Sequence, residues 1–157
     1  MNRAGPSGAV DRAPPLPAPT ATAHLLGVAG LLPFAAGAAL IWWVDEALQP
    51  YAVLAFSAYS AVILSFLGGI HWGFAMRQGR PAVALLWWGV TPSLVAWLAV
   101  LLPAAALSLL LHGLMLWLCF AVDRRVYRAQ GAAAWLPMRL RLTVVASLGC
   151  FVGAAGA

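Results

Sequence analysis

Two histidines lie inside long apolar stretches of this sequence, and they are the side chains best suited to chemistry. His71 stands in the block GGIHWG at 68–73, next to Trp72, and His112 stands near the middle of the apolar run 104–122. An ionisable side chain at membrane depth is a candidate functional residue by default. Because histidines on two helices can also ligate a haem iron, one interpretation is a transport or cofactor site, for haem or a quinone, that uses His71 and His112.

The same histidines also have a structural interpretation, in which each one bonds to a neighbouring helix or lies at the membrane interface. The sequence has no CxxCH motif, and neither helix carries a second histidine. Cys119 and Cys150 lie in separate runs without the spacing of metal ligands, as is typical of small apolar side chains within helices. We therefore expect no cofactor, no metal site and no catalytic residues.

A third candidate feature is the sequence Asp123-Arg124-Arg125, which ends the fourth apolar run. Arginine near a helix C-terminus complements the helix dipole, and Asp123 can pair with a neighbouring arginine. The cluster is either a solvated group facing lipid headgroups or a docking site for a partner, with Asp123 and Arg124 as its candidate residues.

Small residues recur every four positions in the second apolar run, at Ser57, Ala61, Ser65, Gly69 and Gly73. Residues at this spacing lie close together on a helix surface, and small side chains let membrane helices approach closely. We expect Ser65, Gly69 and Gly73 to pack against another helix. Packing within the bundle and contact with a second copy of the chain both remain open.

These residues must be positioned by membrane helices, because the composition does not suit a water-soluble domain. Hydrophobic residues make up 64% of the chain and charged residues only 8%, against roughly 25% charged in a soluble domain. The run 51–76 lacks Asp, Glu, Lys and Arg over 26 residues. At about 1.5 Å per residue, such a helix is longer than the ~30 Å hydrocarbon core of a bilayer.

Five apolar runs predict an all-α bundle of five transmembrane helices. The Pro- and Ala-rich residues 1–24 predict a disordered tail, and 25–157 form the membrane domain. Pro33 and Pro92 fall inside two runs and predict kinks. The predicted helices are 25–44, 51–76, 82–102, 104–122 and 138–157.

The arginines predict the orientation of the bundle. Five helices place all nine basic residues, every one an arginine, on the side of the N-terminus, and they place Asp45 and Glu46 on the other side. The positive-inside rule then puts the N-terminus inside and the C-terminus outside. Membrane topology therefore explains the net charge of +5, and we expect the lipid bilayer rather than nucleic acid as the partner.

The stretch 58–73, which ends in the pattern Leu-Gly-Gly-x-His-Trp-Gly, resembles a membrane-domain family of unknown function, family 3429. The segment LPFAAGA at 32–38 and the pair Asp123-Arg124 are also similar to that family. The resemblance covers roughly 25–152. It implies a small multi-helix membrane protein and supplies no activity and no site residues.

Taken together, the sequence favours a non-enzymatic accessory or assembly protein of a bacterial-type inner membrane. Its expected partner is a membrane protein or a second copy of the chain. The alternative is the small-molecule or cofactor-binding protein that uses His71 and His112.

Overall fold

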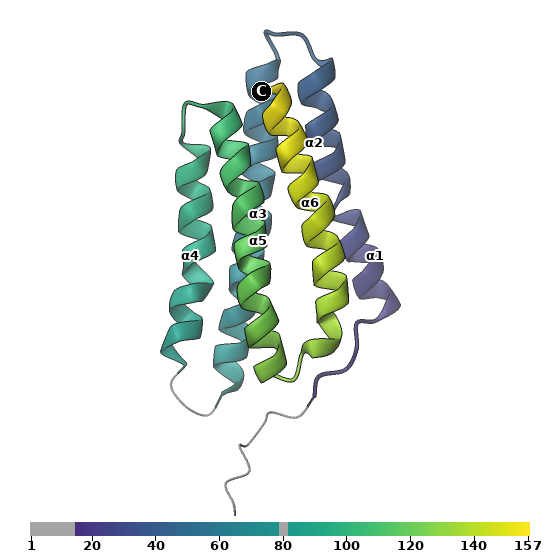
Figure 1. The fold of residues 1–157 in the computed structure, drawn as a ribbon, viewed down its shortest axis with the longest axis vertical. Coiled ribbons are helices and arrows are strands. Elements are labelled where there is room, and N and C mark those ends of the chain that lie inside the picture. The colour runs from purple at the N-terminus through teal and green to yellow at the C-terminus, as the bar shows by residue number, and fades with distance from the viewer. Residues whose placement is uncertain (1–14, 79–81) are drawn as a thin grey trace, which may run out of the picture.

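The structure is a computed structural model that describes residues 15–78 and 82–157. Those residues form helices and connecting turns, without strands. Five helical segments are long and apolar enough to cross a membrane, and they run side by side along the long axis of the molecule (Figure 1). The predicted all-α bundle with five membrane-spanning helices is therefore confirmed.

The first span consists of two helices, α1 (Ala21–Ala29) and α2 (Leu32–Trp43), joined at Gly30 and Leu31. The break lies next to Pro33 in the first turn of α2, where the proline ring is compatible with helix geometry and its missing N–H leaves no bond unmade. Helix α1 starts four residues before the expected position, because the Thr20 hydroxyl accepts a hydrogen bond from the Ala23 amide and caps the helix.

Helix α3 (Gln49–Arg77) is the longest element, and it packs against α2, α4 and α5. Residues on one face are buried at intervals of three and four, as expected for a helix that has one side in the core. That face carries His71 together with Ser60 and Leu64, as predicted. Its members are Val53, Phe56, Ser57, Ser60, Leu64, Leu67, Gly68, His71 and Phe74.

The predicted row of small residues on α3 does not stay on the buried face. Ser57 is buried, Ser65 is exposed, and a Cβ atom added at Gly69 or Gly73 would meet no atom within 4 Å. Four residues turn a helix by about 400°, so each step drifts by about 40° around the axis. Packing of Ser65, Gly69 and Gly73 within the bundle therefore does not occur, and their contact with a partner stays a prediction.

Helix α4 (Val83–Val100) crosses α3 at two glycines. A Cβ atom on Gly68 would collide with the carbonyl oxygen of Gly89, and one on Gly89 would collide with the Trp72 ring. Pro92 lies inside α4 and is buried. The close approach of α3 to α4 thus uses Gly68, which faces inward, rather than the neighbouring Gly69.

Helix α5 (Ala105–Ala129) continues about two turns beyond the predicted end at Val122. The reason is that Asp123 and Tyr127 are buried on the same side as the preceding apolar residues, so packing supports the helix after the hydropathy falls. A short 3-10 helix (Ala133–Trp135) then leads into α6 (Leu136–Gly156), which carries Pro137 in its first turn. Helix α6 packs against α5 and α2.

Part of the predicted disordered tail is held against the bundle. Residues 1–14 lie outside the described part of the chain, but the Leu16 amide donates to the carbonyl oxygen of Gly131, and the carbonyl of Pro17 accepts from the Trp135 indole. Leu16 also packs beside Tyr127. The expectation of disorder up to residue 24 is therefore wrong for residues 15–24.

Candidate functional site

Three ionisable side chains from different helices meet inside the bundle. His71 comes from α3, Asp123 from α5 and Arg139 from α6; the first two have 1% of their surface exposed and Arg139 has 8%. The Arg139 atoms Nε and Nη2 both donate to Oδ2 of Asp123, at 2.9 and 2.6 Å, and Nε2 of His71 lies 3.4 Å from Oδ1 of Asp123. We call His71, Asp123 and Arg139 the ionic cluster.

The local sequence explains how each member reaches the cluster. His71 follows Leu64 and Leu67 by seven and four residues on the buried face of α3. On α5, Asp123 follows the buried Cys119 by four residues. On α6, Arg139 lies in the first turn and precedes the buried Thr143 by four residues. Helical periodicity thus directs all three side chains to the interior.

Both ring nitrogens of His71 lie near oxygen atoms. Nδ1 lies 3.3 Å from the carbonyl oxygen of Leu67 and Nε2 lies 3.4 Å from Oδ1 of Asp123. A neutral imidazole can donate from one nitrogen only. The two contacts are therefore not both hydrogen bonds while the ring is neutral, and within the described residues Nε2 and Oδ1 make no hydrogen bond.

Aromatic rings enclose the His71 side of the cluster. The His71 ring lies edge-to-face with Phe74 and with Trp88, each at 6.4 Å between centroids. Phe74 in turn lies edge-to-face with Tyr127, at 5.3 Å. In such a low-dielectric environment an ion pair is strong once formed, but removal of one partner leaves the other charge buried without compensation.

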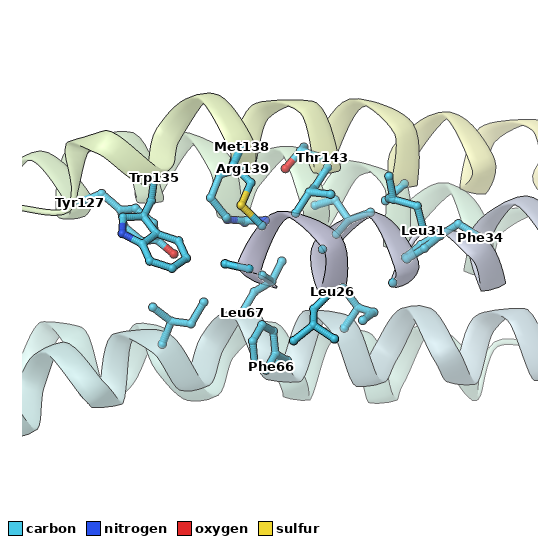
Figure 2. Close-up of a pocket in the computed structure, with 18 residues that line it drawn as sticks. Leu26, Leu31, Phe34, Phe66, Leu67, Tyr127, Trp135, Met138, Arg139 and Thr143 are labelled. Carbon is cyan, nitrogen blue, oxygen red and sulfur yellow. The ribbon is translucent and has the colours of Figure 1, made fainter. Parts of the chain in front are cut away.

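A cavity of about 350 Å³ adjoins the Arg139 side of the cluster. It lies between α1, α3 and α6, as Figure 2 shows, with Trp135 and Tyr127 at one end and Leu31 and Phe34 at the other. Its remaining lining is almost entirely apolar. We call this space, with all of its lining residues, the lateral cavity.

The structure places the other predicted site residues in different environments. Trp72 lies on the α4 side of α3, where its indole nitrogen donates to the carbonyl oxygen of Leu86 at 3.1 Å. Arg124 is exposed. Of the candidates proposed from the sequence, only His71 and Asp123 are brought together.

His112 is completely buried on α5, and its contacts differ from those of His71. Its Nδ1 atom lies 2.7 Å from the carbonyl oxygen of Ser108 in the same helix, and Nε2 makes no hydrogen bond within the described residues. Nearby, the hydroxyls of Ser57 and Ser108 are 3.2 Å apart. A single site that uses both histidines is therefore not favoured by their contacts.

Sequence reasoning missed Arg139 as a site residue, because an arginine in the first turn of a membrane helix also fits an interfacial position. One signal pointed to it. Asp123 is the single acidic residue in the predicted helix 104–122 and the loop that follows it, and a buried carboxylate needs a cationic partner. Tyr127 and Trp88 were missed because their roles depend on how the helices face each other.

The cluster neutralises charge and links helices. The Asp123 carboxylate is balanced by the Arg139 guanidinium, and α3, α5 and α6 are joined through their side chains. Among residues 15–78 and 82–157, no group of three or more His, Cys, Asp or Glu side chains lies close enough together to hold a metal ion. Cys119 and Cys150 are both free and buried.

Comparison with known proteins places this fold in a family. The chain is 46% identical over 80 residues to transmembrane protein 69 of Xenopus tropicalis and 36% identical over 77 residues to transmembrane protein 69 of Mus musculus. These matches cover 48% and 47% of the chain and 31% of each relative, so the chain matches less than a third of their length. No solved structure matches the chain. Residues 19–155 match the family described as protein of unknown function (DUF3429), and the chain therefore belongs to that family.

Proposed function

We propose that the protein is a non-enzymatic accessory or assembly protein of the cell inner membrane, and that it acts by binding another membrane protein or a second copy of itself. The observation that carries this proposal is the outward position of Gly69 and Gly73. A Cβ atom at either position would meet nothing within 4 Å, although most of the neighbouring exposed surface carries bulky side chains such as Phe66 and Val62.

Two exposed glycines one turn apart form a shallow strip on a membrane helix. A second helix can approach such a strip closely, which increases van der Waals contact where no water drives association. Ser65 extends the strip by one turn, and its hydroxyl is already bonded to the Ala61 carbonyl of its own helix at 2.8 Å. A partner helix would therefore meet small residues without unpaired polar groups along a little more than two turns.

The distribution of charge supports the predicted orientation. Arg77, Arg124, Arg125, Arg128 and Arg141 are exposed. They belong to the end of the bundle where α3 and α5 finish and α6 begins (Figure 1), whereas Asp45 and Glu46 belong to the opposite end. Under the positive-inside rule the arginine-rich end faces the cytoplasm and Ala157 faces outward. Anionic lipid headgroups, rather than nucleic acid, are the partners that suit arginines at this position.

A non-enzymatic role is consistent with the ionic cluster. Asp123 and Arg139 bind each other through two hydrogen bonds, and His71 is enclosed by Phe74 and Trp88. The second candidate function, small-molecule binding, is favoured by the lateral cavity. That cavity is lined by Arg139 and not by His71 or His112, so we do not carry the two-histidine cofactor site forward.

Substitution of the two glycines tests the proposal. We expect Gly69→Leu and Gly73→Leu each to reduce at least tenfold the partner that co-purifies with a tagged copy in mild detergent, as measured by quantitative mass spectrometry. Because a Cβ atom at either position would meet nothing within 4 Å, the melting temperature should not fall. Ala121→Leu, a small-to-large change at an exposed position on α5, is the matched control.

A differently tagged second copy separates the two kinds of partner. Recovery of that copy identifies self-association, and recovery of another membrane protein at a fixed ratio identifies an accessory role. Complexes that survive both glycine substitutions in full would contradict the proposed interface.

A further inference from the structure

We propose that the lateral cavity is a binding site for a single-chain fatty acid, with its carboxylate at Arg139 and its acyl chain along the apolar lining toward Phe34. This inference does not depend on the interface at Gly69 and Gly73, because the cavity lies between α1, α3 and α6. It concerns a ligand taken from the bilayer.

The cavity has an exposed rim and a buried floor. Phe66 and Leu26, which line it, are 66% and 67% exposed, whereas Phe34, Leu67 and Leu116 at the floor are at most 5% exposed. Exposed apolar side chains on a membrane helix face the lipid. The mouth of the cavity therefore opens toward acyl chains rather than toward water, and a ligand enters sideways from the bilayer.

The polarity of the lining changes along the cavity. Arg139 is the one charged side chain among the lining residues, and it lies nearer to Trp135 and Tyr127 than to Leu31 and Phe34 (Figure 2). Arg139 stands one turn inside the start of α6, on the side where the arginines gather. This places the polar end at the depth of lipid headgroups and the apolar end nearer the bilayer centre, which is the orientation of a fatty acid in one leaflet.

The charges favour an anionic head group. The hydrogen bonds of Arg139 to Asp123 use Nε and Nη2 and both go to Oδ2, so this pair does not use the donors of Nη1. Guanidinium groups bind carboxylates and phosphates well because of their planar array of donors. Asp123 is already balanced by Arg139. The exposed arginines at this end of the described chain, Arg124, Arg125, Arg128 and Arg141, have no further acidic residue beside them, and the local field is therefore positive.

The size of the cavity favours one chain. Ligand pockets typically span about 300–1,000 Å³, and this cavity has about 350 Å³. That volume takes a carboxylate and part of one acyl chain, with the rest extending through the mouth into the bilayer. A phospholipid would have to leave its second chain and most of its head group outside this volume.

Photolabelling tests the site with the full-length protein in phosphatidylcholine nanodiscs. A stearic acid analogue that carries a diazirine in its chain is the probe, and labelled residues are identified by mass spectrometry. We expect labels on the cavity lining, at least tenfold weaker when oleic acid is added. Methyl oleate, which has the same chain without the anionic head, should not compete.

Paired variants control for the fold. Ile63→Trp places a larger side chain at a half-buried lining position and should abolish the label, whereas Val62→Trp, one residue away and 63% exposed, should keep it. Asp123→Asn combined with Arg139→Gln removes both charges without leaving one unpaired, and should weaken labelling at least tenfold. Arg124→Gln, at an exposed position, should not.

Three results would overturn the proposal. One is competition by methyl oleate equal to that by oleic acid, which would remove the role of Arg139. Another is labelling of the cavity that persists in Ile63→Trp. The third is stronger competition by oleoyl lysophosphatidic acid than by oleic acid, which would assign the head group as a phosphate instead of a carboxylate.

Discussion

Arg139 binds one carboxylate oxygen of Asp123, sixteen residues earlier in the chain, through two hydrogen bonds. Nε and Nη2 of the arginine both donate to Oδ2 of the aspartate, at 2.9 and 2.6 Å. The other carboxylate oxygen, Oδ1, faces His71 on a third helix. The pair links the end of α5 to the start of α6 inside the bundle, and Oδ1 of Asp123 points toward α3. This arrangement suggests that the stability of the bundle depends more on the pairing than on either charge alone.

Asp123→Asn should therefore be more harmful than the double variant Asp123→Asn, Arg139→Gln. Removing one partner of a buried pair leaves an uncompensated charge and costs about 3–5 kcal/mol, whereas neutralising both is often close to neutral. Unfolding in mixed micelles, followed by tryptophan fluorescence, measures both free energies. Arg124→Gln, at an exposed site, should change stability by less than about 0.5 kcal/mol. A double variant as unstable as the single one would show that the charges are not coupled.

The neighbouring glycines 68 and 69 should respond oppositely to alanine. At Gly68 an added Cβ collides with the backbone of Gly89, so Gly68→Ala should destabilise by about 1–3 kcal/mol through overpacking. At Gly69 an added Cβ meets nothing, and alanine should be neutral or stabilising by up to about 1 kcal/mol because of its higher helix propensity. The melting temperatures of Gly68→Ala and Gly69→Ala, each compared with that of the unmodified protein, test this difference. Equal losses would mean that α3 is rotated from the described orientation.

Phenylalanine should be tolerated better at position 112 than at position 71. The Nδ1 contact of His112 is with its own helix, so His112→Phe leaves no side chain on another helix without a partner, and the expected loss of about 1–3 kcal/mol comes from fitting the larger ring into the core. His71→Phe brings in the same larger ring and in addition removes the polar group that lies 3.4 Å from Oδ1 of the Asp123 carboxylate, so its loss should exceed that of His112→Phe by about 1 kcal/mol. The same unfolding assay compares them. A larger loss for His112→Phe would indicate an interaction of its ring that the described contacts lack.

Labelling of introduced cysteines should confirm the orientation. Cys119 and Cys150 are buried, with 1% and 0% exposure, so the native thiols should stay unreactive in the folded protein. In intact cells, an impermeant maleimide should label Glu46→Cys, and Arg128→Cys should react only after the membrane is permeabilised. The reverse pattern would place the arginine-rich end outside.

Features that depend on the local sequence were predicted, and features that depend on contacts between helices were not. The five spans follow from hydropathy, and Pro33 correctly indicated a break in the first span. His71 and Asp123 were identified as candidates because polar groups are scarce in apolar runs. Arg139 was not, because its position in the first turn of a helix fits an interface equally well. The end of α5 was also missed, since burial of Asp123 and Tyr127 depends on their neighbours.

The sequence by itself determined the number and order of the membrane spans, because each is a local sum of apolar residues along the chain. It also determined that the arginines gather at one end. The tertiary structure decided how each helix is rotated about its axis, and thereby which residues meet. A row spaced by four drifts by about 40° per step, so Ser57 faces inward while Gly73 faces outward. The ionic cluster exists only because three helices rotate His71, Asp123 and Arg139 toward a common interior, and the periodicity of one helix does not specify the face of another.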